Sequence, residues 1–249
     1  MTKGNGSKGL RRLLSARNSV KRKTLQEQAP QVFHAVELHA IWQRSGLDVG
    51  FLLDEQPDKG REAWRLGTLL AESAYEIQAS ILEAIHGFYK QAMMSLRSAL
   101  ELAFLGFYYY DRQEEYVSSY IEGKTRTAKL GEVLESIFSR PPFQDFDLKF
   151  LLKQEILRIY NELSRFTYSR GSERQEIFIR YEVAGAGLRL EYNERAFDQW
   201  YVNFHTLSHI VNTSLVLKYP HALRLPHWTA IEALPENRLT QLKDVLELH

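Results

Sequence analysis

Two oppositely charged side chains share one face of a strongly apolar predicted helix. In YKQAMMSLRSALELAFLGFYYY, residues 89–110, Arg97 falls among apolar residues when the segment is projected at about 100° per residue. Glu101 follows four residues later, about 40° around the same face. A charge that points into a helical bundle is costly unless it is paired, so we expect Glu101 to pair with Arg97. The pair is either a buried structural ion pair or the electrostatic part of a functional site.

Two histidines four residues apart are the candidate metal ligands. His205 and His209, in HTLSH, share a helix face where they could bind Zn²⁺, with Asp198 two turns earlier on a similar face. Three ligands from one helix fit tetrahedral geometry poorly, and the sequence lacks the intervening Glu of a metalloprotease helix. Paired core or boundary histidines are the favoured interpretation, and no cofactor is predicted.

The N-terminal segment has a strong excess of positive charge. Residues 1–30 hold eight basic side chains and one acidic side chain, Glu27, which gives a net charge of +7. Because the whole chain has a formal net charge of +1, the remaining residues have −6. This arm is a candidate for binding nucleic-acid phosphates; the alternatives are a solvated tail and an arm packed on an acidic partner. The residues expected to contact phosphates are Arg11, Arg12, Arg17, Lys21, Arg22 and Lys23.

The composition is typical of a globular protein with a substantial core. The chain has 249 residues, of which 44% are hydrophobic and 25% charged. The absence of cysteine excludes a disulfide framework, a thiolate metal site and a cysteine nucleophile, and it fits a reducing compartment. The apolar uncharged run over 102–110 is far shorter than the roughly 20 residues of a membrane span. We therefore expect a cytoplasmic protein with no membrane partner.

The hydrophobic spacing predicts a bundle of antiparallel helices. Apolar residues recur every three or four positions over 61–86, and Gly87 separates this helix from a second over 88–110, so the two form a hairpin. The N-terminal residues 1–9 are expected to be disordered, and 47–60 to be a loop. The other predicted helices span 10–28, 32–44, 111–123, 128–139, 147–167, 195–218 and 240–248.

One segment changes to a period of two residues. Apolar and polar residues alternate in IFIRYEV, residues 177–183, and in LRLEY, residues 188–192, with AGAG between them. This pattern predicts a β-hairpin at about 176–193. The expected fold class is an all-α antiparallel helical bundle with one inserted β-hairpin and a basic N-terminal arm. The expected organisation is a flexible arm over 1–30, a short helix and linker over 31–60, the bundle over 61–218, and a C-terminal tail with a short helix over 219–249.

The segments QAMMSLRSALEL, YIEGK and IYNELSRFTYSRG follow one another within about residues 61–218, before the predicted hairpin and the last helix. This order of elements resembles a branch of the HEPN superfamily, prokaryotic helical bundles often tied to defence and toxin–antitoxin systems. The resemblance implies a homodimer. It also implies metal-independent ribonuclease chemistry at an Arg…His motif near the end of a core helix, where histidine transfers protons near neutral pH.

The helix end that should carry this histidine has a tyrosine. The branch is expected to show Leu-Ser, two residues, a hydrophobic residue and then His; here Leu163 and Ser164 begin the pattern and Tyr168 occupies the histidine position. A tyrosine, with a pKa of about 10, donates hydrogen bonds but is a poor base at neutral pH. No histidine in the chain follows an arginine with four to six residues between them, so the catalytic pair is absent as a local motif.

We therefore expect a HEPN-like binding or scaffolding subunit of a prokaryotic defence or toxin–antitoxin-related system. It would form a homodimer, associate with a protein partner in that system, and bind RNA or DNA through the arm. Two other functions stay open. One is a metal-independent endoribonuclease with a divergent site built from Arg97, Glu101, Ser164 and Tyr168. The other is a sensor that binds a small molecule through polar groups within the bundle.

Overall fold

The computed structural model describes residues 4–54, 60–110, 112–167, 192–220 and 229–246. Within these ranges all regular elements are helices, which confirms the all-α prediction, and no strand occurs. The β-hairpin predicted at about 176–193 falls almost wholly on 168–191, outside the described residues. The helices are α1 (Gly4–Glu27), α2 (Ala29–Asp54), α3 (Gly60–Ile85), α4 (Tyr89–Tyr109), α5 (Gln113–Glu115), the π-helix η2 (Tyr116–Ile121), α6 (Leu130–Ile137), α7 (Phe143–Phe150), α8 (Leu152–Thr167), α10 (Glu194–Lys218), α11 (Thr229–Glu232) and α12 (Glu236–Val245).

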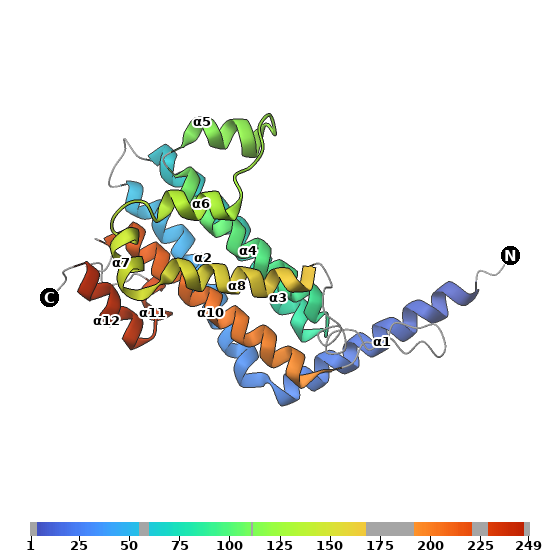
Figure 1. Cartoon of the computed structure of the whole chain (residues 1–249). Helices are drawn as coiled ribbons and strands as arrows, with labels where there is room; N and C mark the ends of the chain where they lie inside the picture. Colours follow the sequence, from blue (N-terminus) through green and yellow to red (C-terminus); the bar gives the residue numbers. More distant parts are fainter. Residues whose placement is uncertain (1–3, 55–59, 111, 168–191, 221–228, 247–249) are drawn as a thin grey trace.

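The hairpin of α3 and α4 is the centre of the bundle, as predicted (Figure 1). Gly87 turns the chain between the two helices with φ +82°, a conformation that glycine adopts without strain. Two buried serines join the helices: Ser73 Oγ donates to the carbonyl of Ala99 and Ser80 Oγ to the carbonyl of Ala92, each at 2.7 Å. Small side chains at this contact allow the two backbones to approach each other closely.

The last core helix, α10, packs against α4, α2 and α8. Its predicted apolar stripe is buried, with Trp200, Phe204 and Val211 all at 0% exposure. Trp200 Nε1 donates to Ser80 Oγ at 2.8 Å, so one buried serine joins α3, α4 and α10. The predicted helix over 195–218 is thereby confirmed and placed at the core.

Several predicted boundaries are wrong, and two of them concern α2 and α8. The segment 47–54, predicted as loop, continues α2, so Gly46 and Gly50 lie within a helix in spite of their low helix propensity. The single helix predicted over 147–167 is two helices, α7 and α8, separated by Leu151 in the left-handed conformation with φ 57°. Asp147 Oδ1 accepts a hydrogen bond from the backbone N–H of Lys153 at 2.7 Å, which caps the start of α8.

The N-terminal arm is a long helix, and its distal part stands clear of the bundle (Figure 1). α1 begins at Gly4, within the segment predicted to be disordered. Only its last turns pack on the bundle, through Val20 and Thr24, which are buried. Gln28 alone separates α1 from α2: its N–H donates to the carbonyl of Thr24 at 2.8 Å, and its carbonyl accepts from the N–H of Val32 at 3.0 Å. Backbone hydrogen bonding therefore runs through the junction.

The described helices include none with the length and apolar character needed to cross a bilayer.

Candidate functional site

Arg97 on α4 has the predicted partner and one from another helix. Its Nη2 donates to Glu101 Oε1 at 3.1 Å and to the hydroxyl of Tyr160 on α8 at 2.9 Å. The guanidinium carbon lies 5.0 Å from the centre of the Tyr160 ring, within range of a cation–π attraction. The Arg97 side chain is 18% exposed and that of Glu101 35%, so the pair lies at the edge of the core. The pairing predicted from the helix projection is confirmed.

Helix α8 contributes the hydroxyl of Tyr160 to this cluster. Burial, with the nearby negative charge of Glu101, raises the pKa of Tyr160, so this phenol is a donor and not a base at neutral pH. Ser164 lies one turn further along α8; its Oγ is buried and has no hydrogen-bond partner among the described residues. Tyr168 lies outside the described residues, so its predicted convergence with Arg97 stays a prediction.

A row of imidazole and phenol rings lies between α2 and α10. His34 Nδ1 and the hydroxyl of Tyr201 share a hydrogen bond of 2.6 Å. The centre of the His34 ring lies 5.5 Å from that of His205, and the rings of His205 and His209 meet edge to face at 4.0 Å. Burial lowers the pKa of His205; it lowers that of His209 to about 4, where positive charge on His205 and Arg238 acts in the same direction. Both imidazoles are therefore neutral at pH 7.

The histidine row lacks the arrangement of a metal centre. Within the described residues, no group of three or more His, Cys, Asp or Glu side chains is placed to hold a metal ion. Asp198, the third ligand considered with His205 and His209, is exposed on the first turns of α10. The row is better described as tilted and edge-to-face rings that fill the boundary between α2 and α10.

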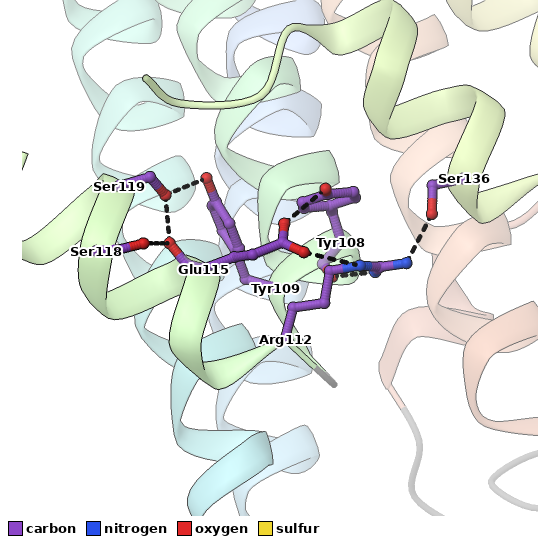
Figure 2. Close-up of polar contacts among 7 residues, drawn as sticks. All are labelled: Tyr108, Tyr109, Arg112, Glu115, Ser118, Ser119 and Ser136. Atoms are coloured by element: carbon purple, nitrogen blue, oxygen red, sulfur yellow. Dashed lines mark hydrogen bonds and ion pairs between the residues drawn. The ribbon is translucent and has the colours of Figure 1, made fainter. Parts of the chain in front are cut away.

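A second polar network holds the end of α4 (Figure 2). Arg112 Nη1 donates to the carbonyl of Tyr108 at 2.6 Å, and Nη2 donates to Ser136 Oγ on α6 at 2.7 Å. The Tyr108 hydroxyl donates to Glu115 Oε2 at 2.7 Å, and burial together with this carboxylate raises the pKa of Tyr108 to about 12. Arg112 lies over the Tyr108 ring, 4.2 Å from its centre. These contacts join α4, α5 and α6, so we assign the network a structural role.

The arm presents its basic side chains to solvent. Arg12 was predicted to contact phosphates, but its side chain lies outside the described residues. At the base of the arm, Gln28 Nε2 donates to the hydroxyl of Tyr192 at 2.9 Å, and Lys23 Nζ lies 5.1 Å from the centre of the Tyr192 ring. The base of α1 is thereby fixed to the residues that lead into α10. The described basic side chains of α1 are all exposed: Arg11, Arg17, Lys21, Arg22 and Lys23.

The sequence did not reveal the partners that come from distant elements. Tyr160 lies four residues before Ser164, and this spacing is the one signal in the sequence that it shares a helix face with the candidate site. His34 meets Tyr201 across 167 positions of sequence, a separation that leaves no local pattern. Comparison of the chain with protein-family models, with curated proteins and with solved structures finds no match.

Proposed function

We propose that this chain is a HEPN-like nucleic-acid-binding subunit that holds phosphates with α1. The observation that carries the proposal is the exposed row of basic side chains on a helix that stands clear of the bundle. The first 26 residues contain no acidic side chain, and within the described part of the chain no ion pair neutralises α1. The proposed setting, a prokaryotic defence or toxin–antitoxin-related system, rests on the sequence resemblance of residues 61–218.

A polyanion would stabilise this helix as well as bind to it. Arg17 and Lys21 lie four residues apart, on adjacent turns of α1, where like charges repel. Most of the stability of a helix in a protein comes from tertiary packing, which the distal part of α1 lacks, so opposite charge laid along it favours the helical state. Release of condensed counterions from the nucleic acid adds the larger, salt-dependent part of the affinity.

The contacts of Arg97 favour binding over cleavage as the activity of this chain. Its guanidinium already meets a carboxylate and a phenol, Glu101 and Tyr160, and the raised pKa of the Tyr160 phenol makes it a poor base at neutral pH. The endoribonuclease alternative predicts phosphodiester cleavage by the metal-free protein. Binding without turnover is the result that we expect.

The experiment uses fluorescence anisotropy to measure how the affinity for a nucleic-acid duplex changes with salt concentration. The range is roughly 50 to 300 mM, in which phosphate contacts dominate the affinity. The variant converts Arg11, Arg17, Lys21 and Arg22 to Gln. The control converts the same number of exposed basic residues on the bundle, Arg44, Lys124, Lys129 and Arg158, to Gln, so both proteins have the same net charge. Each phosphate contact contributes about 0.9 to the slope of log affinity against log salt for B-form DNA, so the arm variant should lose about 2 to 4 from this slope, according to how many of the four side chains contact phosphates.

The control separates local contacts from overall charge. The bundle variant should keep most of the wild-type slope, because long-range charge is largely screened at these salt concentrations. Equal losses in the two variants, or an unchanged slope in the arm variant, would overturn the proposal. Thermal unfolding should change little in either protein, since all eight side chains are exposed.

A further inference from the structure

Four polar side chains form a straight stripe along the solvent side of α1. Arg11, Ser15, Asn18 and Arg22 follow one another at spacings of four, three and four residues, so they share one helix face. All four are exposed. The face that packs on the bundle, marked by the buried Val20 and Thr24, lies about 150° to 170° around the helix from the stripe.

Basic side chains flank the stripe on both sides. Arg17 and Lys21 project about 90° to 130° to one side of it, and Lys23 about 110° to the other. Such an arrangement suits a ligand that surrounds the helix on two sides with phosphates. A flat acidic protein surface would engage one flank and leave the other in solvent.

The dimensions match the major groove of B-form DNA. A helix with its side chains is about 10–12 Å across, and this groove is about 12 Å wide and 8.5 Å deep, with a phosphate backbone along each wall. The major groove of A-form RNA is deep and too narrow for side chains to read, and a single strand has no second wall. From Arg11 to Arg22 the helix rises about 16 Å, which spans roughly five base pairs.

The residue types on the stripe are those that read base edges. Arginine pairs with the O6 and N7 atoms of guanine, asparagine pairs with the N6 and N7 atoms of adenine, and serine contacts either kind of base. The proposed phosphate contacts come from the flanks, so the stripe is available for the floor of the groove. Within the described part of the chain, the Asn18 and Ser15 side chains have no hydrogen-bond partner.

We propose that α1 lies in the major groove of duplex DNA, where Arg11, Ser15, Asn18 and Arg22 contact base edges and Arg17, Lys21 and Lys23 contact the two phosphate backbones. This inference rests on the proposed function and gives it a ligand class. The ligand is a B-form DNA duplex, with guanines expected near both ends of the contacted site and adenine near its middle.

The first experiment compares the affinities of three ligands for the full chain. A duplex selected from a random DNA library is compared with an RNA duplex of the same sequence and with one of its single DNA strands, in the same salt. The DNA duplex should bind at least ten-fold more tightly than either. Equal affinity for all three would overturn the inference yet leave phosphate binding by the arm intact, and the salt slope of the quadruple variant reports on the latter separately.

The second experiment removes single base contacts by substitution. Asn18→Ala should weaken binding to the selected duplex by roughly ten-fold to a hundred-fold and relax the preference at one or two base pairs. Alanine favours helix more than asparagine does, so loss of α1 structure cannot cause this weakening. The matched flank variant, Arg17→Gln, should weaken all sequences alike. If the Asn18→Ala variant enriches the same sequence from the random DNA library as strongly as the wild type does, the inference is overturned.

The third experiment changes the DNA and leaves the protein unchanged. Replacing guanine by 7-deazaguanine removes the N7 acceptor from the major groove while every phosphate and the minor groove stay unchanged. Wild-type affinity should fall several-fold on this duplex, and the Arg11→Gln/Arg22→Gln variant should bind both duplexes equally. An unchanged wild-type affinity would place the helix outside the major groove.

Discussion

The hydroxyl of Tyr160 accepts a hydrogen bond of 2.9 Å from Nη2 of Arg97, so that a residue of α8 completes the pairing of a charge on α4. A guanidinium held by both a carboxylate and a phenol positions two helices relative to each other. The helix projection predicted that Arg97 needs a partner and identified Glu101. Tyr160 is a second partner, which the packing of α8 on α4 provides. The following predictions test this cluster and its surroundings.

Removal of Arg97 should destabilise the bundle. Arg97→Ala leaves Glu101 and Tyr160 without their shared donor, and we expect a loss of about 1–3 kcal/mol in the free energy of unfolding measured in urea. Arg97→Met with Glu101→Leu should recover much of this loss, because an apolar pair needs no counter-charge. Arg158→Ala, an exposed position on the same α8 helix as Tyr160, is the control and should change stability by less than about 0.5 kcal/mol. Equal effects of Arg97→Ala and Arg158→Ala would contradict the structural role.

Stability should fall in acid because of His209. Burial lowers the pKa of this imidazole to about 4, from 6.5 in an unperturbed histidine. Between pH 6.5 and 4 the unfolded chain binds a proton that the folded chain does not, so the contribution is complete above pH 6.5 and is lost as the pH falls toward 4. Because His209 is partly exposed, we expect a loss of no more than about 2 kcal/mol. Urea unfolding of His209→Gln should show a shallower decline with pH; a decline as steep as in wild type would refute the assignment.

The serine between three helices should be costly to remove. Ser80→Ala leaves Trp200 Nε1 without an acceptor and the carbonyl of Ala92 without this donor, both in a buried place. We expect about 1–3 kcal/mol of destabilisation, seen as a lower unfolding temperature. Ser139→Ala, at an exposed serine, is the matched control. If Ser80→Ala in a Trp200→Phe background costs as much as it does in wild type, the Trp200 contact contributes nothing.

Anchoring of the arm should contribute to nucleic-acid affinity. Tyr192→Ala removes both the acceptor for Gln28 and the ring beneath Lys23. The phosphate contacts remain, so the salt slope should stay near the wild-type value, while affinity falls because a loosened helix must be ordered on binding. Tyr192→Phe keeps the ring and should have an intermediate effect. If Tyr192→Ala changes the salt slope and leaves the affinity unchanged, Tyr192 does not act by anchoring the arm.

The HEPN resemblance predicts a homodimer. Static light scattering on the full chain at roughly ten to fifty micromolar, where a specific dimer of ordinary affinity is populated, should give twice the chain mass of 29.0 kDa. A single-chain mass throughout this range would argue against the dimer.

Strong periodicity predicted the fold well where each helix buries one clear face. The apolar spacing of 61–86 and 195–218 located α3 and α10 to within a residue or two, because burial along one stripe leaves a repeating pattern. The pattern failed at Leu151, where a single left-handed residue divides α7 from α8 without a glycine or proline to signal it. It failed again at Gly46 and Gly50, since helix packing can retain residues of low propensity.

The candidate site was predicted in part for a related reason. Arg97 and Glu101 are neighbours on one helix, so helix geometry alone pairs them. Tyr160 and the His34–Tyr201 contact depend on which helices the fold places side by side, and no spacing in the sequence encodes that choice.

Two backbone hydrogen bonds through Gln28 join α1 to α2 across the bend between them. A flexible linker would let the arm swing while the bundle stayed still, but here Thr24, Gln28 and Val32 are joined turn by turn. We therefore expect a sideways load on the tip of α1, such as the bending of a bound duplex, to act on α2. This helix holds Trp42, buried in the core, and His34, whose ring lies near that of His205 on α10. The base of the arm is therefore coupled to residues inside the bundle.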